Sequence, residues 1–138
     1  MVVDDDPSIL ISVREVLESV GFEVVTANSG RGCIEELQRG FRGVILMDIM
    51  MPGMDGWDTI REIVDNNLLE GNIIAMLTAK DQPDEEMDKL KEYVIDYLTK
   101  PFDPDELIAT IDEYLTYLEK LDTGDERLMD NHNRILNR

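Results

Sequence analysis

Acidic and polar side chains follow four of the chain's apolar runs, each at the point where the run ends. Asp4 and Asp5 follow the first run, Asp48 follows a central run, and Thr78 and Lys100 follow two later ones. Carboxylates held close together repel one another unless a cation joins them, and oxygen ligands of this kind suit Mg²⁺. An ammonium and a hydroxyl beside the cation can hold the oxygens of an anionic group. These residue types therefore indicate Mg²⁺-dependent phosphoryl transfer, with Asp48 as the nucleophile that forms an aspartyl phosphate.

These side chains can meet only if the runs before them are strands of one sheet. Short apolar runs alternate with helical apolar spacing, which predicts a βαβαβαβαβα order. We expect strands at residues 2–3, 22–26, 44–47, 73–77 and 94–98, and helices at residues 7–20, 29–39, 55–64, 84–92 and 103–118. Right-handed crossovers of this length give a parallel sheet covered by helices on both faces. The predicted fold class is α/β, a doubly wound (βα)5 domain whose strand ends share one ligand-binding edge.

The first helix has clear start and stop signals. Asp6 suits the N-cap, Pro7 suits the first helical position, and Gly21 suits the end of the helix. We therefore assign Asp6 to the cap and not to the metal site. The central strand also ends abruptly, because Pro52 and Gly53 in the loop after Asp48 cannot continue it.

Composition bounds the kind of protein. The 138 residues carry a net charge of -18, which argues against direct nucleic-acid binding, since that requires a basic surface. No apolar run is long enough to cross a bilayer and no signal peptide is visible, so we expect no membrane insertion. Cys33 is the single cysteine, which suits a reducing compartment and a cytoplasmic location. We expect one domain over residues 1–120, with residues 121–138 as a C-terminal tail or the start of a linker.

Four stretches together resemble the receiver domain of two-component response regulators. They are residues 2–7 (VVDDDP), 48–56 (DIMMPGMDG), 77–79 (LTA) and 97–102 (YLTKPF). The resemblance covers about residues 1–120. It implies a flavodoxin-like fold with a five-stranded parallel sheet in the order 2-1-3-4-5.

The resemblance also implies roles for the acidic residues. Asp48 would accept a phosphoryl group from the phosphohistidine of a sensor histidine kinase or phosphotransfer protein. Asp5, Asp48 and the backbone carbonyl of Met50 would bind Mg²⁺, and Asp4 would help through a water molecule. The chain would catalyse only its own phosphorylation and dephosphorylation, and so would not be an enzyme in the ordinary sense.

Three further residues take roles from the resemblance. Lys100 and Thr78 would hold the phosphoryl oxygens, and the family has a cis bond before the proline that matches Pro101. Tyr97 matches an aromatic residue that changes rotamer on activation. Thr78 and Tyr97 would together switch the face formed by the fourth helix, fifth strand and fifth helix. We expect that face to bind a partner, either an output protein or a second copy of the chain in a homodimer.

One segment departs from the family pattern. The family usually has a glycine and a small residue before the fifth strand, where this chain has Tyr93, Val94 and Ile95. Tyrosine adopts the positive φ of a helix-ending glycine reluctantly. The departure therefore concerns the end of the fourth helix and the partner surface, and not the phosphorylation site.

Two other classes of protein remain as alternatives. Asp4 and Asp6 form the D-x-D pair of a free-standing Mg²⁺-dependent phosphatase of the haloacid-dehalogenase type, which uses the second aspartate as general acid. A flavin-binding module of similar fold is the other, although clustered carboxylates would repel the flavin phosphate. Turnover of an aryl phosphate would identify the first, and a yellow chromophore the second.

Overall fold

The sheet positions every candidate site residue. The computed structural model describes residues 1–79 and 90–122. Its parallel strands are β1 (Val2–Val3), β2 (Thr26–Ala27), β3 (Gly43–Asp48), β4 (Asn72–Ala79) and β5 (Val94–Lys100). They form one five-stranded sheet in the order β2-β1-β3-β4-β5, which confirms the predicted flavodoxin-like fold and its strand order.

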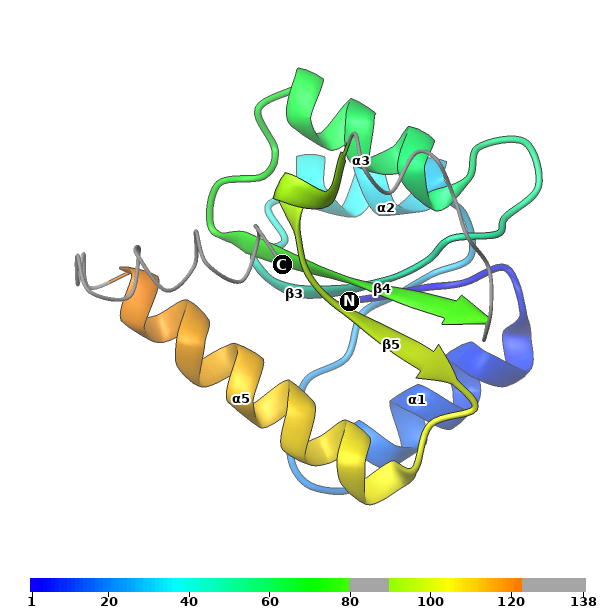
Figure 1. Ribbon diagram of the computed structural model, residues 1–138, viewed down its shortest axis with the longest axis vertical. Helices are drawn as coiled ribbons and strands as arrows, with labels where there is room; N and C mark the ends of the chain where they lie inside the picture. The colour runs from blue at the N-terminus through cyan, green and yellow to red at the C-terminus, as the bar shows by residue number, and fades with distance from the viewer. Residues whose placement is uncertain (80–89, 123–138) are drawn as a thin grey trace.

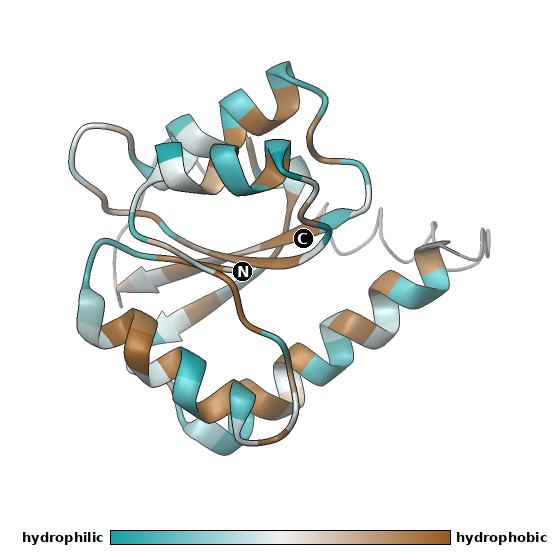
Figure 2. Cartoon of the chain, turned by 180° about the vertical axis from the view of Figure 1, so that it is seen from behind, coloured by the Kyte–Doolittle hydropathy of each residue, from teal (hydrophilic) through white to brown (hydrophobic). Residues whose placement is uncertain are grey.

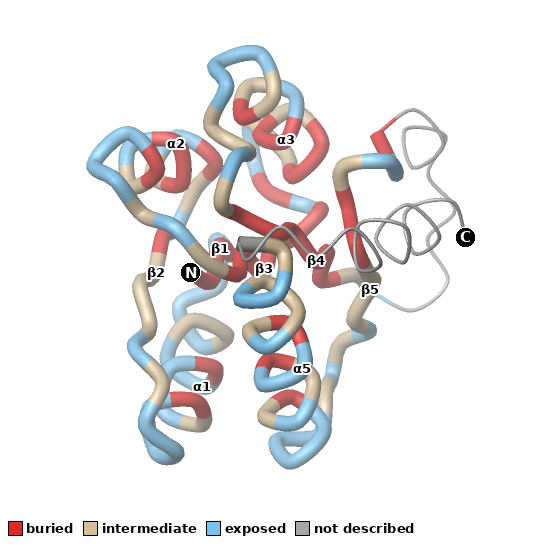
Figure 3. The backbone as a smooth tube through the Cα atoms, turned by 90° about the vertical axis from the view of Figure 1, so that its left-hand side faces the viewer, coloured by how far each residue is buried: buried red, intermediate tan, exposed pale blue. Residues whose placement is uncertain are grey.

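Helices cover both faces of this sheet (Figure 1). They are α1 (Pro7–Glu18), α2 (Gly30–Gln38), α3 (Gly56–Asp65) and α5 (Pro104–Asp122). Figure 3 shows α2 and α3 on one face and α1 and α5 on the other, with the most deeply buried backbone in the strands between them. This arrangement leaves the strand ends, and the loops that follow them, at a common edge.

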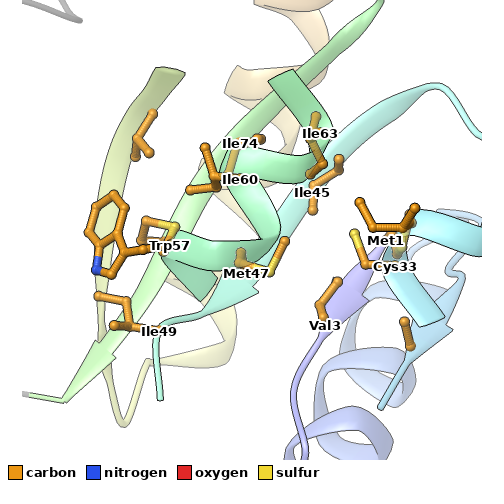
Figure 4. Packing of buried hydrophobic residues seen from close by; sticks show 14 of the residues in the cluster. Met1, Val3, Cys33, Ile45, Met47, Ile49, Trp57, Ile60, Ile63 and Ile74 are labelled. Atoms are coloured by element: carbon orange, nitrogen blue, oxygen red, sulfur yellow. The ribbon is translucent and has the colours of Figure 1, made fainter. Parts of the chain in front are cut away.

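Two apolar clusters fill the two layers. The first lies under α2 and α3, where Trp57, Ile60 and Ile63 pack on Ile49 and Met47 (Figure 4). The second lies under α1 and α5 and includes residues from those helices and from the other side of the strands. Brown apolar stripes on the sheet-facing sides of the helices alternate with teal polar ones in Figure 2. Burial of such stripes is the main stabilising term for helices of this length.

The helix starts follow the local sequence chemistry. The Asp6 side chain accepts a hydrogen bond from the Ser8 N–H, and Pro7 is the first residue of α1. Ser29 caps α2 by accepting from the Gly32 N–H, as its side-chain type and position predict. These observations confirm the predicted starts of α1 and α2.

The second strand is much shorter than predicted. We expected it over residues 22–26, but β2 contains only Thr26–Ala27. It pairs with β1, which is itself two residues long, in the register Val2 with Thr26 and Val3 with Ala27. The residues before Thr26 therefore have no strand beside them to complete a ladder, although their composition suits a strand.

The predicted helix at residues 84–92 falls mostly outside the described residues. Its last part is visible as a 3₁₀ turn, η1 (Lys91–Tyr93), which leads directly into β5. Asn67 is the only non-glycine residue with positive φ in the described part of the chain, so Tyr93 does not adopt the glycine conformation. The chain accommodates this tyrosine by a tight turn in place of a left-handed cap. The tail was predicted at residues 121–138. Residues 121 and 122 belong to α5, and residues 123–138 lie outside the described residues.

Candidate functional site

Two acidic residues lie just beyond the end of β1. Asp4 is 1% exposed, and its Oδ1 accepts a hydrogen bond from the Asp6 N–H at 3.0 Å. Asp5, the next residue, is exposed to solvent. The chain therefore offers one buried and one accessible carboxylate at this edge of the sheet.

Asp48 is the last residue of β3, a strand buried along almost its whole length. Its side chain remains close to the core, at 6% exposure for the residue. The loop that follows is held at both ends, since Ile49 N–H donates to Leu77 O at 3.2 Å and Gly56 N–H donates to Ile49 O at 2.9 Å. A Cβ on Gly56 would lie 2.4 Å from the carbonyl oxygen of Asp48. Only glycine allows α3 to begin so close to the end of β3.

Lys100 connects the two acidic strand ends. Its ammonium nitrogen lies 2.7 Å from Asp4 Oδ2 and 3.2 Å from Asp48 Oδ1. The peptide bond between Lys100 and Pro101 is cis, as the resemblance implied. Lys100 is the last residue of β5 and Asp4 follows β1, and β3 and β4 lie between these two strands. The site therefore joins strands that are not neighbours in the sheet.

The carboxylates of Asp4 and Asp48 lie close together in a buried site, and this changes the pKa values of the groups around them. Burial, and then the negative charge of Asp4, raise the pKa of Asp48 to about 6, while Lys100 acts in the opposite direction. Burial acts to lower the pKa of Lys100, but its bonds to Asp4 and the charge of Asp48 outweigh burial and raise it. The ammonium therefore stays charged at neutral pH, whereas burial disfavours the ionised form of Asp48.

The carboxylates fit a divalent cation. One oxygen from each of Asp4, Asp5 and Asp48 lies within 4.8 Å of the others. An all-oxygen donor set of this kind, with one ligand open to water, suits Mg²⁺, which keeps several water ligands. Met50 follows Asp48 by two residues and is exposed, and the role of its carbonyl as a ligand stays a prediction.

The structure does not bring Thr78 into direct contact with the carboxylates. Thr78 follows Leu77, the β4 residue paired with Asp48, so it belongs to the same edge of the sheet. Its hydroxyl donates to the carbonyl oxygen of Ala79 at 2.9 Å. The side chain that donates a hydrogen bond to Asp48 at this edge is Lys100. Contact of Thr78 with a group on Asp48 remains a prediction.

Tyr97 lies on β5, with its ring turned toward the core. The ring packs against the cluster under α2 and α3, and its hydroxyl is buried. The rotamer described here is the inward one. The change of rotamer on activation that the resemblance implies for Tyr97 stays a prediction.

Sequence reasoning missed two features that support the site. The close approach of Gly56 to Asp48 depends on how α3 meets β3, whereas the sequence indicated only that a helix begins at Asp55 and Gly56. The hydrogen bond from the Tyr114 hydroxyl to Asp96 Oδ2, at 2.6 Å, ties α5 to β5. Asp96 stands one residue before Tyr97 in a strand pattern, and no local signal links it to a tyrosine on the last helix.

Within residues 1–79 and 90–122, no helix is both long and apolar enough to cross a bilayer.

Known proteins resemble the chain in sequence and in structure. The family model of the response regulator receiver domain matches residues 1–112. Protein PilG of Pseudomonas aeruginosa is 32% identical over 125 residues, which cover 88% of this chain and 90% of that protein. A CheY-like receiver domain from Methanospirillum hungatei superposes with a TM-score of 0.83 at 52% identity, covering 87% of this chain and 95% of that one.

Some relatives are much longer. The transcriptional regulatory protein ZraR of Escherichia coli is 34% identical over 122 residues, yet the chain spans only 27% of its length. The alkaline phosphatase synthesis regulatory protein PhoP of Bacillus subtilis is 33% identical over 111 residues, and the chain spans 45% of its length.

Proposed function

Because the chain belongs to the response regulator receiver domain family, we propose that it accepts a phosphoryl group on Asp48 from a phosphohistidine. The donor would be a sensor histidine kinase or a phosphotransfer protein. The observation that carries the proposal is the 3.2 Å contact between Asp48 and Lys100 beside two further carboxylates. It supplies a nucleophile, a fixed positive charge and a cation site in one place.

The proposed step is an in-line displacement at phosphorus. A carboxylate oxygen of Asp48 forms a bond to phosphorus while the bond from phosphorus to the donor's imidazole nitrogen breaks, and that nitrogen keeps the electron pair. Lys100 stabilises the negative charge on the equatorial oxygens. Asp5, Asp48 and the Met50 carbonyl would hold Mg²⁺, with Asp4 acting through water. The bound Mg²⁺ supplies charge neutralisation at the phosphoryl oxygens.

Switching is the second part of the proposal. A phosphoryl group on Asp48 adds close to two negative charges and several acceptor oxygens at the end of β3. The Thr78 hydroxyl would exchange its bond to Ala79 for one to these oxygens, which would shift the end of β4. Tyr97 packs against the core cluster under α2 and α3. When Thr78 moves, the population of the inward Tyr97 rotamer would rise. The face of the fourth helix, β5 and α5 would then bind an output protein or a second copy of the chain.

The chain would act as a switch and catalyse only its own phosphorylation and dephosphorylation. We propose a cytoplasmic location, because the kinases that supply such phosphoryl groups act there. Direct binding of nucleic acid is not part of the proposal, since a net charge of -18 opposes it. The phosphatase alternative loses its general acid, because Asp6 is committed to capping α1.

The proposal is tested by a small-molecule phosphodonor. With acetyl phosphate and Mg²⁺, the mass of the intact chain should increase by about 80 Da, the mass of one phosphoryl group. The adduct should be lost at alkaline pH, because an acyl phosphate hydrolyses there. A chain that gains no mass under these conditions, while a known receiver domain does, would contradict the proposal.

A further inference from the structure

The strand β5 has one more residue than the part of β4 beside it. Ile74 of β4 pairs with Val94, and the next residue of β4 pairs with Asp96. Ile95 is therefore an extra residue in the ladder, and the pairing shifts by one position from there on. This is a β-bulge, which is rare between parallel strands and redirects the side chains that follow it.

The bulge changes which side of the sheet the later residues of β5 face. Successive residues of a regular strand face opposite sides. Ile95 packs in the cluster under α1 and α5, and the next side chain, Asp96, reaches the same side, where it bonds to Tyr114 of α5. Tyr97 then packs against the cluster under α2 and α3, to which Val94 also belongs. Regular alternation from Val94 would turn Tyr97 to the side of α1 and α5.

The carboxylate of Asp96 bonds to two elements at once. Its Oδ1 accepts from the N–H of Tyr97 at 2.9 Å, and its Oδ2 accepts from the hydroxyl of Tyr114 at 2.6 Å. Tyr114 is 6% exposed, and burial, followed by the bond to Asp96, raises the pKa of its hydroxyl. The hydroxyl therefore keeps its proton at neutral pH and remains a donor. One carboxylate thus connects α5 to the backbone of Tyr97.

The bond to Tyr114 favours the bulged register over a regular one. Without the bulge, Asp96 would pair with Met76, a fully buried residue of the cluster under α2 and α3. A carboxylate is costly in apolar surroundings unless it has a partner there. With the bulge, Asp96 faces α5, where the Tyr114 hydroxyl is its partner.

We propose that the bond from Tyr114 to Asp96 holds the bulge of β5 and thereby keeps the Tyr97 ring on the side of α2 and α3. Tyr114 is then a positioning residue for Tyr97, and it lies on α5, an element of the face expected to bind a partner. A partner that shifts α5 weakens this bond, and Tyr97 responds through the backbone of β5. The inference rests on the proposed function in one respect, which is that Tyr97 takes part in the switch.

Tyr114→Phe tests the bond, because it removes the hydroxyl and keeps the ring. Tyr117→Phe is the matched control, since it removes a hydroxyl from the same helix and leaves Tyr114 in place. Both chains and the parent carry 3-fluorotyrosine, and the Tyr97 signal in the fluorine spectrum is identified with Tyr97→Phe. Hydrogen exchange is measured at the Tyr97 amide and, as a reference for global opening, at the buried Leu46 amide.

In Tyr114→Phe the Tyr97 signal should shift or split, and the Tyr97 amide should exchange about tenfold faster than in Tyr117→Phe. Tenfold is the approximate effect of losing one hydrogen bond to a charged acceptor. The Leu46 amide should exchange equally in the two variants. A Tyr97 signal equal to that of the control would overturn the proposal, even if the chain were less stable. Equal acceleration at Leu46 and Tyr97 would also overturn it, because the bond would then stabilise the fold without positioning Tyr97.

Two changes at Asp96 test the other side of the bond. Asp96→Ala removes the acceptor and should move the Tyr97 signal as Tyr114→Phe does. Asp96→Asn can still bond to the Tyr97 N–H and to the Tyr114 hydroxyl, so its Tyr97 signal should stay close to that of the parent. Equal shifts in the two variants would contradict the role of the bond.

Beryllofluoride, an aspartyl-phosphate mimic, separates this inference from the proposed function. The fluorine spectra and exchange rates above are recorded without it, so they test the bond in the resting chain. The Tyr97 signal of the parent should then change when beryllofluoride and Mg²⁺ are added. If the signal does not change, the proposed switching of Tyr97 fails, whereas the comparison of Tyr114→Phe with Tyr117→Phe still decides whether Tyr114 positions the ring.

Discussion

Asp48 and Lys100 contact each other although their strands are not neighbours. Asp48 Oδ1 lies 3.2 Å from Lys100 Nζ, while β4 separates β3 from β5 in the sheet. The lysine side chain therefore extends across the end of β4 to reach the carboxylate. The ammonium is therefore already in position when a phosphoryl group enters, which is the preorganisation that transfer requires.

The raised pKa of Asp48 predicts how Mg²⁺ binding depends on pH. The ionised carboxylate is the metal ligand, and a proton competes with Mg²⁺ below a pKa of about 6. The dissociation constant for Mg²⁺ should increase by up to about tenfold for each pH unit below 6, and level off above it. Mg²⁺ titrations followed by Trp57 fluorescence, between about pH 4.5 and 8, measure this dissociation constant. An affinity that stays constant down to about pH 4.5 would show that Asp48 titrates as an ordinary carboxyl.

The raised pKa of Asp48 also predicts how the free energy of unfolding depends on pH in metal-free buffer. The pKa of Asp48 is higher in the folded chain than its ordinary value, so its protonated form stabilises the fold. That contribution is complete below about pH 4 and is lost as pH rises through about 6. Added Mg²⁺ should reverse the trend, because the cation stabilises the ionised form.

Asp5→Asn tests the exposed ligand of the metal site. Mg²⁺ binds the folded chain and should raise its Tm, and this rise should be abolished in the Asp5→Asn variant. Asp6→Asn is the matched control, because asparagine also caps a helix and Asp6 lies outside the carboxylate cluster. Melting curves of the three chains with and without Mg²⁺ decide the point. Equal Mg²⁺ shifts in the Asp5→Asn and Asp6→Asn chains would refute a site built on Asp5.

Much of the fold was predictable because its signals are local. Asp6 and Ser29 each precede a helix by one position and have side chains that accept from the first turn. The fold class followed from the alternation of apolar periods, and the strand order from the family resemblance. The length of β2 was not predictable, because it depends on how much of β1 lies beside it.

The sequence predicted which residues form the candidate site, but it did not predict most of the contacts that these residues make. Parallel strands bring Asp4, Asp48 and Lys100 to one edge whatever their side chains do. The burial of Asp4 against the exposure of Asp5, and the bond of the Thr78 hydroxyl to Ala79, depend on loop geometry that no residue pattern encodes. The same holds for the inward ring of Tyr97, which packing in the first core cluster determines.

Gly56→Ala should damage the site through its backbone. A Cβ at Gly56 would meet the carbonyl oxygen of Asp48 at 2.4 Å, so the end of β3 or the start of α3 must move. We expect a loss of roughly 2 kcal/mol or more in the free energy of unfolding and a weaker Mg²⁺ affinity. Gly32→Ala is the control, since the first turn of α2 leaves 3.3 Å to the nearest side-chain oxygen and alanine favours helix. Equal losses in denaturant titrations of the two variants would contradict the proposed close approach.

Thr78→Ala separates phosphorylation from switching. The variant should still accept a phosphoryl group on Asp48, yet lose most of the change in self-association or partner binding that beryllofluoride, an aspartyl-phosphate mimic, causes in the parent chain. Thr26→Ala is the control, because Thr26 lies on β2, the strand at the far side of the sheet from β4, and outside the proposed face. Sedimentation with and without beryllofluoride compares the chains. Unchanged responses in Thr78→Ala would show that Thr78 does not relay the signal.

Phosphorylation of Asp48 itself is tested most directly by intact-mass measurement of two variants treated with acetyl phosphate and Mg²⁺. Asp48→Asn should gain no mass, because an amide is not a nucleophile. Asp55→Asn, altered in the same loop at the cap of α3, keeps a capping side chain and should gain about 80 Da, as the parent chain does. A gain of one phosphoryl group by Asp48→Asn equal to that of Asp55→Asn would contradict the account, because the acceptor would then be another residue.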